Sequence, residues 1–148
     1  MVMNIEIGPY LIDRHEVSNR DFAEFVKAGG YEREEFWKHP FQDGAEELSF
    51  AEAMERFRDL TDRTGPAGWR VGGFPDGEGD LPVSGVSWFE AAAYAEFAGK
   101  SLPSIYHWYF ADNAGDLQLL PGLYLPKSNY GTAGPRARCV DCVVGSHG

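Results

Sequence analysis

The sequence has little cysteine and no long hydrophobic run. Only two of its 148 residues are Cys, and no window approaches the roughly 18 uninterrupted apolar residues of a membrane-spanning helix. The first six residues lack the basic flank and the apolar stretch of a secretion signal. These absences argue against a membrane protein and an exported protein, and they predict a cytoplasmic location.

Positive charge is also scarce. The chain has 13 Lys and Arg residues against 23 Asp and Glu residues, which gives a formal net charge of −10 and an isoelectric point near 4.7. Such a surface repels phosphate groups, so we expect neither nucleic acid nor an anionic membrane as a partner. Solubility is the simplest role for the acidic excess.

Glycine, proline and aromatic residues are abundant instead. There are 18 Gly, nine Pro, 10 Phe, seven Tyr and four Trp residues in a chain that is 43% hydrophobic. The hydrophobic share suits a single globular domain and argues against disorder. The many helix and strand breakers predict a loop-rich α+β fold, in which large rings hold irregular backbone in place.

The first expected elements are a strand over residues 10–13 and a helix that begins near Ser18. Ser18 and Asp21 have the spacing of a capping box. Gly29-Gly30 should end the helix, and a helical turn is expected within residues 32–38. One helix face carries an apolar stripe made of Phe22, Phe25 and Val26.

Three further helices are expected. Ser49 and Glu52 form a capping box that predicts a helix over residues 50–60, followed by an irregular stretch with one strand candidate at residues 69–71. Ser87 begins the next helix, and its five alanines indicate the close approach of another element. Ser104 caps the last. After residue 114 no regular element is predicted.

No established motif for metal binding, nucleophilic catalysis or phosphate binding is present. Cys139 and Cys142 form a C-x-x-C with His147 nearby, which is half of a tetrahedral zinc site. A metal site, a redox dithiol and incidental thiols all stay open, and incidental thiols are the simplest interpretation. The other histidines, His15, His39 and His107, lie far apart, and the last is expected to be a surface or hydrogen-bonded residue.

Four carboxylates near the start of the chain could be an acid–base set. Solvated faces and favourable placement at a helix N-terminus explain their spacing equally well. They are Asp13, Glu16, Asp21 and Glu24. The residues alone therefore predict an acidic α+β domain and no particular reaction.

Three segments together resemble one known family. Residues 12–31 resemble the "iDryEVTNxxFxxFVxAGGY" opening of the formylglycine-generating enzyme (sulfatase-modifying factor) family. Residues 82–95 resemble its "PVxxVSWxEAxAY" signature, and residues 97–108 resemble "WAGKRLPTEAEW". Order and spacing agree as well. Residues 36–69 resemble the members appended to bacterial serine/threonine kinases.

The resemblance implies a loop-rich variant of the C-type lectin fold, in which the motif residues act as structural determinants. Those residues are Asp13, Glu16, Asn19, Ser87, Trp88, Glu90, Gly99, Pro103 and Trp108. Complete members use copper, with calcium as a second candidate, and oxygen to oxidise a substrate cysteine to formylglycine. A peptide or protein would then be the partner.

The C-terminal part departs from the family pattern. The family's "GNVWEW" and "RGGSW" segments, which precede its copper-binding cysteine pair, do not occur. Residues 128–135 resemble the "SNF…GPxxVG" stretch that lies upstream of them, so Cys139 and Cys142 come too early to match the family pair. We therefore expect residues 1–148 to form one partial domain, with the resemblance covering about residues 10–135. The fold would be incomplete at its C-terminus, and the chain alone would hold no cofactor and be inactive.

Two alternatives stay open. The chain could be a non-catalytic binding module for a small ligand, with loop aromatics as contacts, or a truncated remnant of the enzyme. For each of these aromatics, core packing is the favoured role. They are Trp69, Phe74, Tyr124 and Tyr130.

Overall fold

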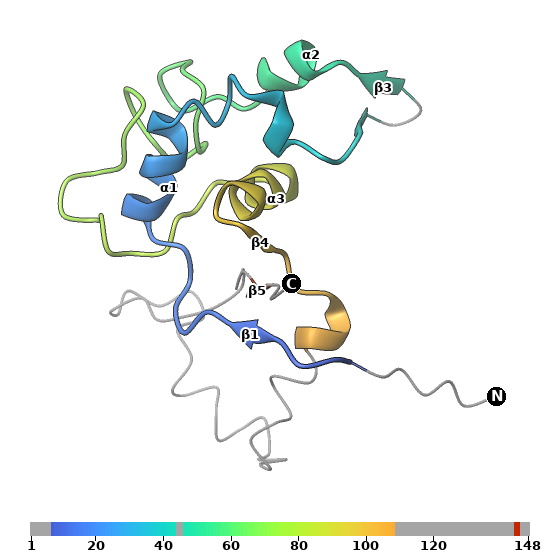
Figure 1. Cartoon of the computed structure of the whole chain (residues 1–148). Coiled ribbons are helices and arrows are strands. Elements are labelled where there is room, and N and C mark those ends of the chain that lie inside the picture. The colour runs from blue at the N-terminus through green and yellow to red at the C-terminus, as the bar shows by residue number, and fades with distance from the viewer. Residues whose placement is uncertain (1–6, 44–45, 109–143, 146–148) are drawn as a thin grey trace, which may run out of the picture.

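The computed structural model describes residues 7–43, 46–108 and 144–145 (Figure 1). Short helices and very short strands alternate with long loops, which confirms the predicted α+β class. In chain order the elements are β1 (Leu11–Ile12), α1 (Asn19–Lys27), the 3₁₀ turn η1 (Glu34–Phe36), β2 (Phe41–Asp43), β3 (Glu46–Leu48), α2 (Phe50–Met54), α3 (Trp88–Phe97), β4 (Lys100–Ser101) and β5 (Val144–Gly145).

Two small antiparallel sheets frame the described part of the chain. In the first, β5 lies between β1 and β4, so that Gly145 is opposite both Leu11 and Lys100. In the second, β2 and β3 form a hairpin with Phe41 opposite Leu48. Figure 1 shows the first sheet below α1, α2 and α3, with α3 leading into β4. None of the helices in the described ranges is long and apolar enough to cross a bilayer.

The predicted capping boxes are all present. Ser18, Ser49 and Ser87 each accept a hydrogen bond from the backbone N–H three residues on, while the acidic residue at that position reaches back to the cap. Gly29 and Gly99 have φ values of 79° and 67° directly after α1 and α3, as predicted for residues that end helices. Residues 105–108 are helical, which confirms the start of the last predicted helix.

Two predictions about the middle of the chain are wrong. The second helix ends at Met54 rather than near residue 60, because the carboxylate of Asp59 captures backbone N–H groups and folds the chain into a turn. The strand candidate at residues 69–71 is only an isolated bridge between Arg70 and Gly73, since Val71 has a φ of +54° that no strand permits.

The core is built largely from rings. Phe22 and Phe25 of the predicted apolar stripe are almost fully buried, and Phe22 stacks on Tyr94 of α3 with ring centroids 5.5 Å apart. Ala93 is fully buried in this core, where its small side chain allows α3 to approach α1 and η1 closely. The remaining large core members are Tyr31, Trp37, Phe41, Met54 and Trp69. Rings therefore hold the loops in place, as the composition predicted.

Candidate functional site

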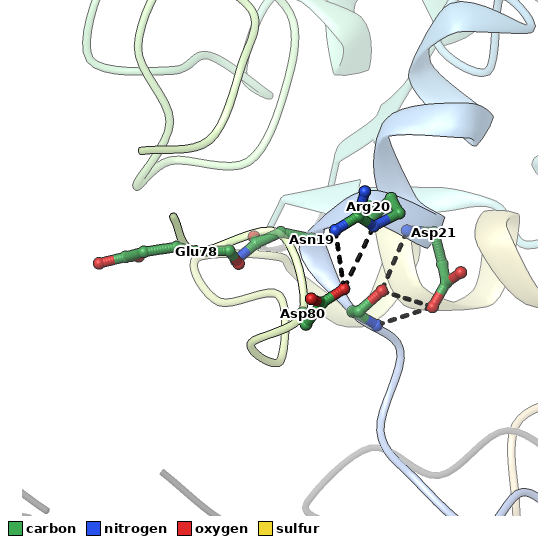
Figure 2. Close-up of polar contacts among 6 residues, drawn as sticks. Asn19, Arg20, Asp21, Glu78 and Asp80 are labelled. Carbon is green, nitrogen blue, oxygen red and sulfur yellow. Dashed lines mark hydrogen bonds and ion pairs between the residues drawn. The ribbon is translucent and has the colours of Figure 1, made fainter. Parts of the chain in front are cut away.

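The family-motif residues lie in several separate places, and the first is the N-terminus of α1 (Figure 2). Asn19 is only 5% exposed. Its Nδ2 donates to the carbonyl of Glu78 at 2.9 Å, and its Oδ1 accepts from the indole Nε1 of Trp69 at 3.0 Å. Its backbone N–H donates to the carbonyl of Leu81. This side chain joins a helix to two distant points of one long loop, which is a positioning role.

Around Asn19 the polar contacts are exposed. Arg20 pairs with Asp80 at 2.9 Å, and the carboxylate of Asp21 accepts from both the hydroxyl and the backbone N–H of Ser18 (Figure 2). Exposed pairs of this kind contribute little to stability because water screens them. The N-terminus of α1 is therefore closed by its own cap and by the loop.

The second place is a buried acid beside a buried phenol. The hydroxyl of Tyr31 donates to Oε1 of Glu90 at 2.6 Å, and the backbone N–H of Ser87 donates to Oε2 at 2.6 Å. Burial raises the pKa of Glu90, although the hydrogen bonds from Ser87 and Tyr31 oppose the rise. Burial and the adjacent carboxylate raise the pKa of Tyr31 well above its usual range. The pair links α3 to the chain after α1, and both carboxylate oxygens have a donor.

The third place lies between β1 and β4. Nζ of Lys100 lies 2.5 Å from the carboxylate of Asp13, and each side chain is about one-third exposed. Nearby, the hydroxyl of Tyr10 donates to the carbonyl of His107 at 2.8 Å, and Nδ1 of His107 accepts from the backbone N–H of Ser104. These contacts confirm that His107 is a hydrogen-bonded residue.

The remaining motif residues do not join these groups. Glu16 is half-buried before α1, and Pro103 is half-buried before the helical turn at residues 105–108. Trp88 is 55% exposed at the start of α3, where its ring contacts His39 with centroids 4.7 Å apart. Trp108 is 39% exposed. Within the described ranges the motif residues therefore form no single convergent site.

Asp59 is the polar centre that the sequence did not reveal. Its Oδ1 accepts from the N–H and hydroxyl of Thr61 and from the N–H of Arg63, and its Oδ2 accepts from the N–H of Gly72. Burial alone would raise the pKa of Asp59, but these four hydrogen bonds outweigh it and lower the pKa to about 2. An Asp at the start of a loop, here in the pattern Asp-x-Thr-x-Arg, is typical of an Asx turn, and this pattern could have predicted the role of Asp59.

The other predicted candidates have mixed outcomes. Trp69 is 2% exposed, and Phe74 packs against it in the core, so core packing is confirmed for both. Cys139 and Cys142 lie outside the described residues, as do Tyr124 and Tyr130. In the part of the chain that the structure describes, no cluster of three or more His, Cys, Asp and Glu residues could hold a metal ion. There too, each buried side-chain nitrogen or oxygen has a hydrogen-bond partner.

Comparison with known proteins gives one consistent result. The family model for the sulfatase-modifying factor enzyme 1-like domain matches residues 2–133. A formylglycine-generating enzyme from Thermomonospora curvata is 35% identical over 93% of this chain and 47% of its own length. An inactive C-alpha-formylglycine-generating enzyme 2 from Bos taurus is 35% identical over 77% of this chain and 41% of its length.

A serine/threonine-protein kinase, Pkn1 of Chlamydia trachomatis, is 30% identical over 80% of this chain and 16% of its own length. The chain thus spans less than half the length of these relatives. The resemblance inferred from three short segments is confirmed over most of the sequence, and the chain belongs to the sulfatase-modifying factor enzyme 1-like domain family.

Proposed function

We propose that this chain is the scaffold part of a formylglycine-generating type of domain, and that residues 7–108 position loops rather than perform chemistry. The observation that carries the proposal is the state of the buried motif residues. Asn19 and Glu90 each have their hydrogen-bonding atoms occupied by partners within the fold. A side chain held in this way orients its neighbours but presents no free group to a substrate.

The proposed fold is the loop-rich C-type-lectin-like variant. Support comes from the very short strands and from the irregular chain between α2 and α3, which is anchored by Trp69. The chain would be an incomplete version of this fold at its C-terminal end. A complete domain would carry the oxidation of a substrate cysteine to formylglycine, with a peptide or protein as substrate.

Copper is the group that such a reaction implies, and the described residues do not fit it. Copper(I) prefers thiolate ligands, and both cysteines of the chain lie beyond residue 108. No catalytic step is therefore assigned to residues 7–108. Calcium binding, the cytoplasmic location and a peptide or protein substrate stay predictions.

The test is formylglycine formation by the 148-residue chain. The chain is incubated in air with copper(I) and a cysteine-containing sulfatase peptide, and aldehyde is captured with an aminooxy probe and read by mass spectrometry. The formylglycine-generating enzyme of Thermomonospora curvata serves as the positive control. We expect aldehyde from the control and none from this chain, and measurable turnover by this chain would refute the proposal.

The two cysteines give a second test. We propose that Cys139 and Cys142 bind soft metal weakly and without ordering the fold, because they come too early in the sequence to match the copper-binding pair of the family. The double change Cys139→Ser with Cys142→Ser should leave Tm unchanged, with or without copper(I) or zinc. A metal-dependent rise in Tm that requires both cysteines would show that they form a structural site.

A non-catalytic role is the second candidate. It is favoured by the Bos taurus relative, which is described as inactive and is 35% identical over 77% of this chain. Under this alternative the chain keeps the family scaffold and uses it for binding. Absence of turnover in the assay above, together with saturable binding of the same peptide, would favour it.

A further inference from the structure

Two aliphatic side chains are exposed on a pair of turns that hydrogen bonds hold together. Leu60 is 61% exposed and Val71 is 62% exposed. The backbone N–H of Leu60 donates to the carbonyl of Trp69 at 3.0 Å, and the N–H of Val71 donates to the hydroxyl of Thr61 at 2.7 Å. The two turns, residues 59–63 and 69–73, are thereby held together although the side chains at their tips face water.

The linked turns are rigidly anchored. Oδ2 of Asp59 accepts from Gly72 N–H at 2.8 Å, which adds a third hydrogen bond between the turns. Behind them, Trp69 is 2% exposed, and its indole N–H donates to Asn19. A surface that is already ordered loses little conformational entropy when a partner binds.

Val71 is also held in a strained conformation. Its φ is +54°, a region that β-branched residues rarely adopt. Such strain persists only where the surrounding structure imposes it. Asn would fit this backbone better and would not present an exposed apolar group. The stability of the fold therefore does not explain valine at this position.

The two turns carry cationic side chains in a strongly acidic protein. Residues 59–63 and 69–73 contain Arg63 and Arg70 together with Asp59 and Asp62, and the carboxylate of Asp59 is occupied by its own hydrogen-bond donors, whereas the whole protein has a net charge of −10. Arg63 and Arg70 are exposed and take part in none of the ion pairs found in the described ranges. Arg63 runs beside the second turn, since its Cδ lies 3.9 Å from the point where a Cβ on Gly72 would stand.

We propose that Leu60, Arg63, Arg70 and Val71, here called the turn-pair surface, dock an acidic segment of a partner protein in which aliphatic residues alternate with Asp or Glu. Charge complementarity selects this occupant, because carboxylates pair with the two free guanidinium groups while aliphatic side chains cover Leu60 and Val71. An anionic membrane is disfavoured, since the rest of the protein is strongly acidic and the apolar area is small. The small area also makes the contact a transient one.

The test uses a defined probe on the full chain. The peptide acetyl-Glu-Val-Glu-Leu-Asp-Val-amide is titrated into the ¹⁵N-labelled protein, and amide shifts are followed by NMR. A second peptide, with Lys in place of each acid, is the charge control. We expect the acidic peptide to shift amides of residues 59–73 in a saturable, salt-sensitive way, and we expect the basic peptide to shift none of them.

Three variants separate docking from folding. Val71→Asn should raise Tm by relieving strain and still weaken peptide binding about tenfold by removing an apolar contact. Arg70→Gln should weaken binding and flatten its salt dependence. Arg14→Gln, another exposed arginine without an ion pair in the described ranges, should leave both Tm and binding unchanged.

Three results of the peptide titration would contradict the proposal. Absence of shifts at millimolar acidic peptide, equal binding of both peptides, or unchanged binding by Val71→Asn would each overturn the proposal. Sedimentation of the unlabelled protein tests whether a second copy of this chain occupies the surface instead. A concentration-dependent dimer that Val71→Asn abolishes would show that a second copy of this chain covers the surface, and the proposal of a different acidic partner would be wrong.

Discussion

Replacing Asp59 by Asn should destabilise the protein through one defined contact. In the folded chain, Oδ1 of Asp59 accepts three hydrogen bonds and Oδ2 accepts one from the N–H of Gly72. An Asn side chain can keep the first three with its carbonyl oxygen. Its NH₂ group must then face the N–H of Gly72, so that two donors oppose each other and the link between the two turns is lost.

The loss in the free energy of unfolding caused by Asp59→Asn can be worked out in two ways. The pKa of Asp59 is lowered from 3.8 to about 2, and one pKa unit corresponds to about 1.36 kcal/mol, which gives about 2 kcal/mol. Loss of one hydrogen bond to a charged group costs about 1.5–3 kcal/mol. Asp59 itself is only 7% exposed, but its neighbours Thr61, Asp62 and Arg63 are exposed, so solvent screens part of this interaction. We therefore expect Asp59→Asn to lower the free energy of unfolding by about 1–2 kcal/mol and Tm by roughly 2–8 °C.

The pH dependence gives the sharper test. Because the pKa of Asp59 is lower in the folded than in the unfolded chain, its stabilisation is fully present above about pH 4 and is lost as the pH falls toward 2. Urea unfolding is followed by tryptophan fluorescence at pH 7, 4 and 3. The difference in the free energy of unfolding between the parent and Asp59→Asn should become smaller as the pH falls. The matched control is Asp62→Asn, whose exposed side chain makes none of these contacts.

Two results would refute the reasoning. One is a difference in the free energy of unfolding between the parent and Asp59→Asn that stays constant or increases from pH 4 to pH 3. The other is an equal loss of stability in Asp62→Asn, which would mean that any charge removed from this loop has the same effect.

Two further predictions concern the core and use the same urea assay. Gly30→Ala should cost about 1–3 kcal/mol, because its Cβ would stand 2.4 Å from the buried ring of Phe25; the control Gly8→Ala has open space and should have no effect, and equal stability of the two would contradict the packing. Tyr31→Phe should cost about 1–3 kcal/mol by removing a donor to Glu90. The pKa of Glu90 is higher in the folded than in the unfolded chain. The contribution of Glu90 to folding stability is therefore greatest below about pH 4.5, and it falls as the pH rises through the pKa of Glu90 in the folded chain. Losing the phenol raises that pKa further, so the Tyr31→Phe deficit should grow from pH 4 to pH 7, and a deficit that shrinks instead would contradict this assignment.

Local signals predicted the helices well. Ser18, Ser49 and Ser87 each begin a helix because a capping box needs only residues three apart, and the chain supplies both partners. The apolar stripe of α1 likewise predicted which face is buried. These features depend on neighbours within about two turns, so the sequence carries them directly.

Contacts between distant segments could not be predicted. Asn19 meets Trp69 and Glu78, which are 50 and 59 positions away, and Tyr31 meets Glu90 across 59 positions. No periodicity encodes such pairs. The length of α2 was wrong for a related reason, because its apolar spacing continues to Phe57 while the hydrogen bonds of Asp59 end the helix early.

In the candidate site too, the sequence predicted local features but not the contacts between distant segments. The family motifs identified Asn19 and Glu90 as structural residues, but only the structure shows that they act in separate networks rather than at one centre. The turn-pair surface had no sequence signal, since Leu60 and Val71 are ordinary residues until the fold brings their two turns together.

The position of Asn19 also has a consequence for the order of folding. Helix α1 can form from local interactions within microseconds, whereas the contacts of Asn19 with Trp69 and Glu78 require loops of about 50 and 60 residues to close. Closing loops of this length costs conformational entropy before these contacts can form, so we expect the contacts of Asn19 to form after the transition state of folding. Removing the amide of Asn19 should then leave the folding rate almost unchanged and accelerate unfolding, so the contacts of this side chain would lengthen the lifetime of the native state.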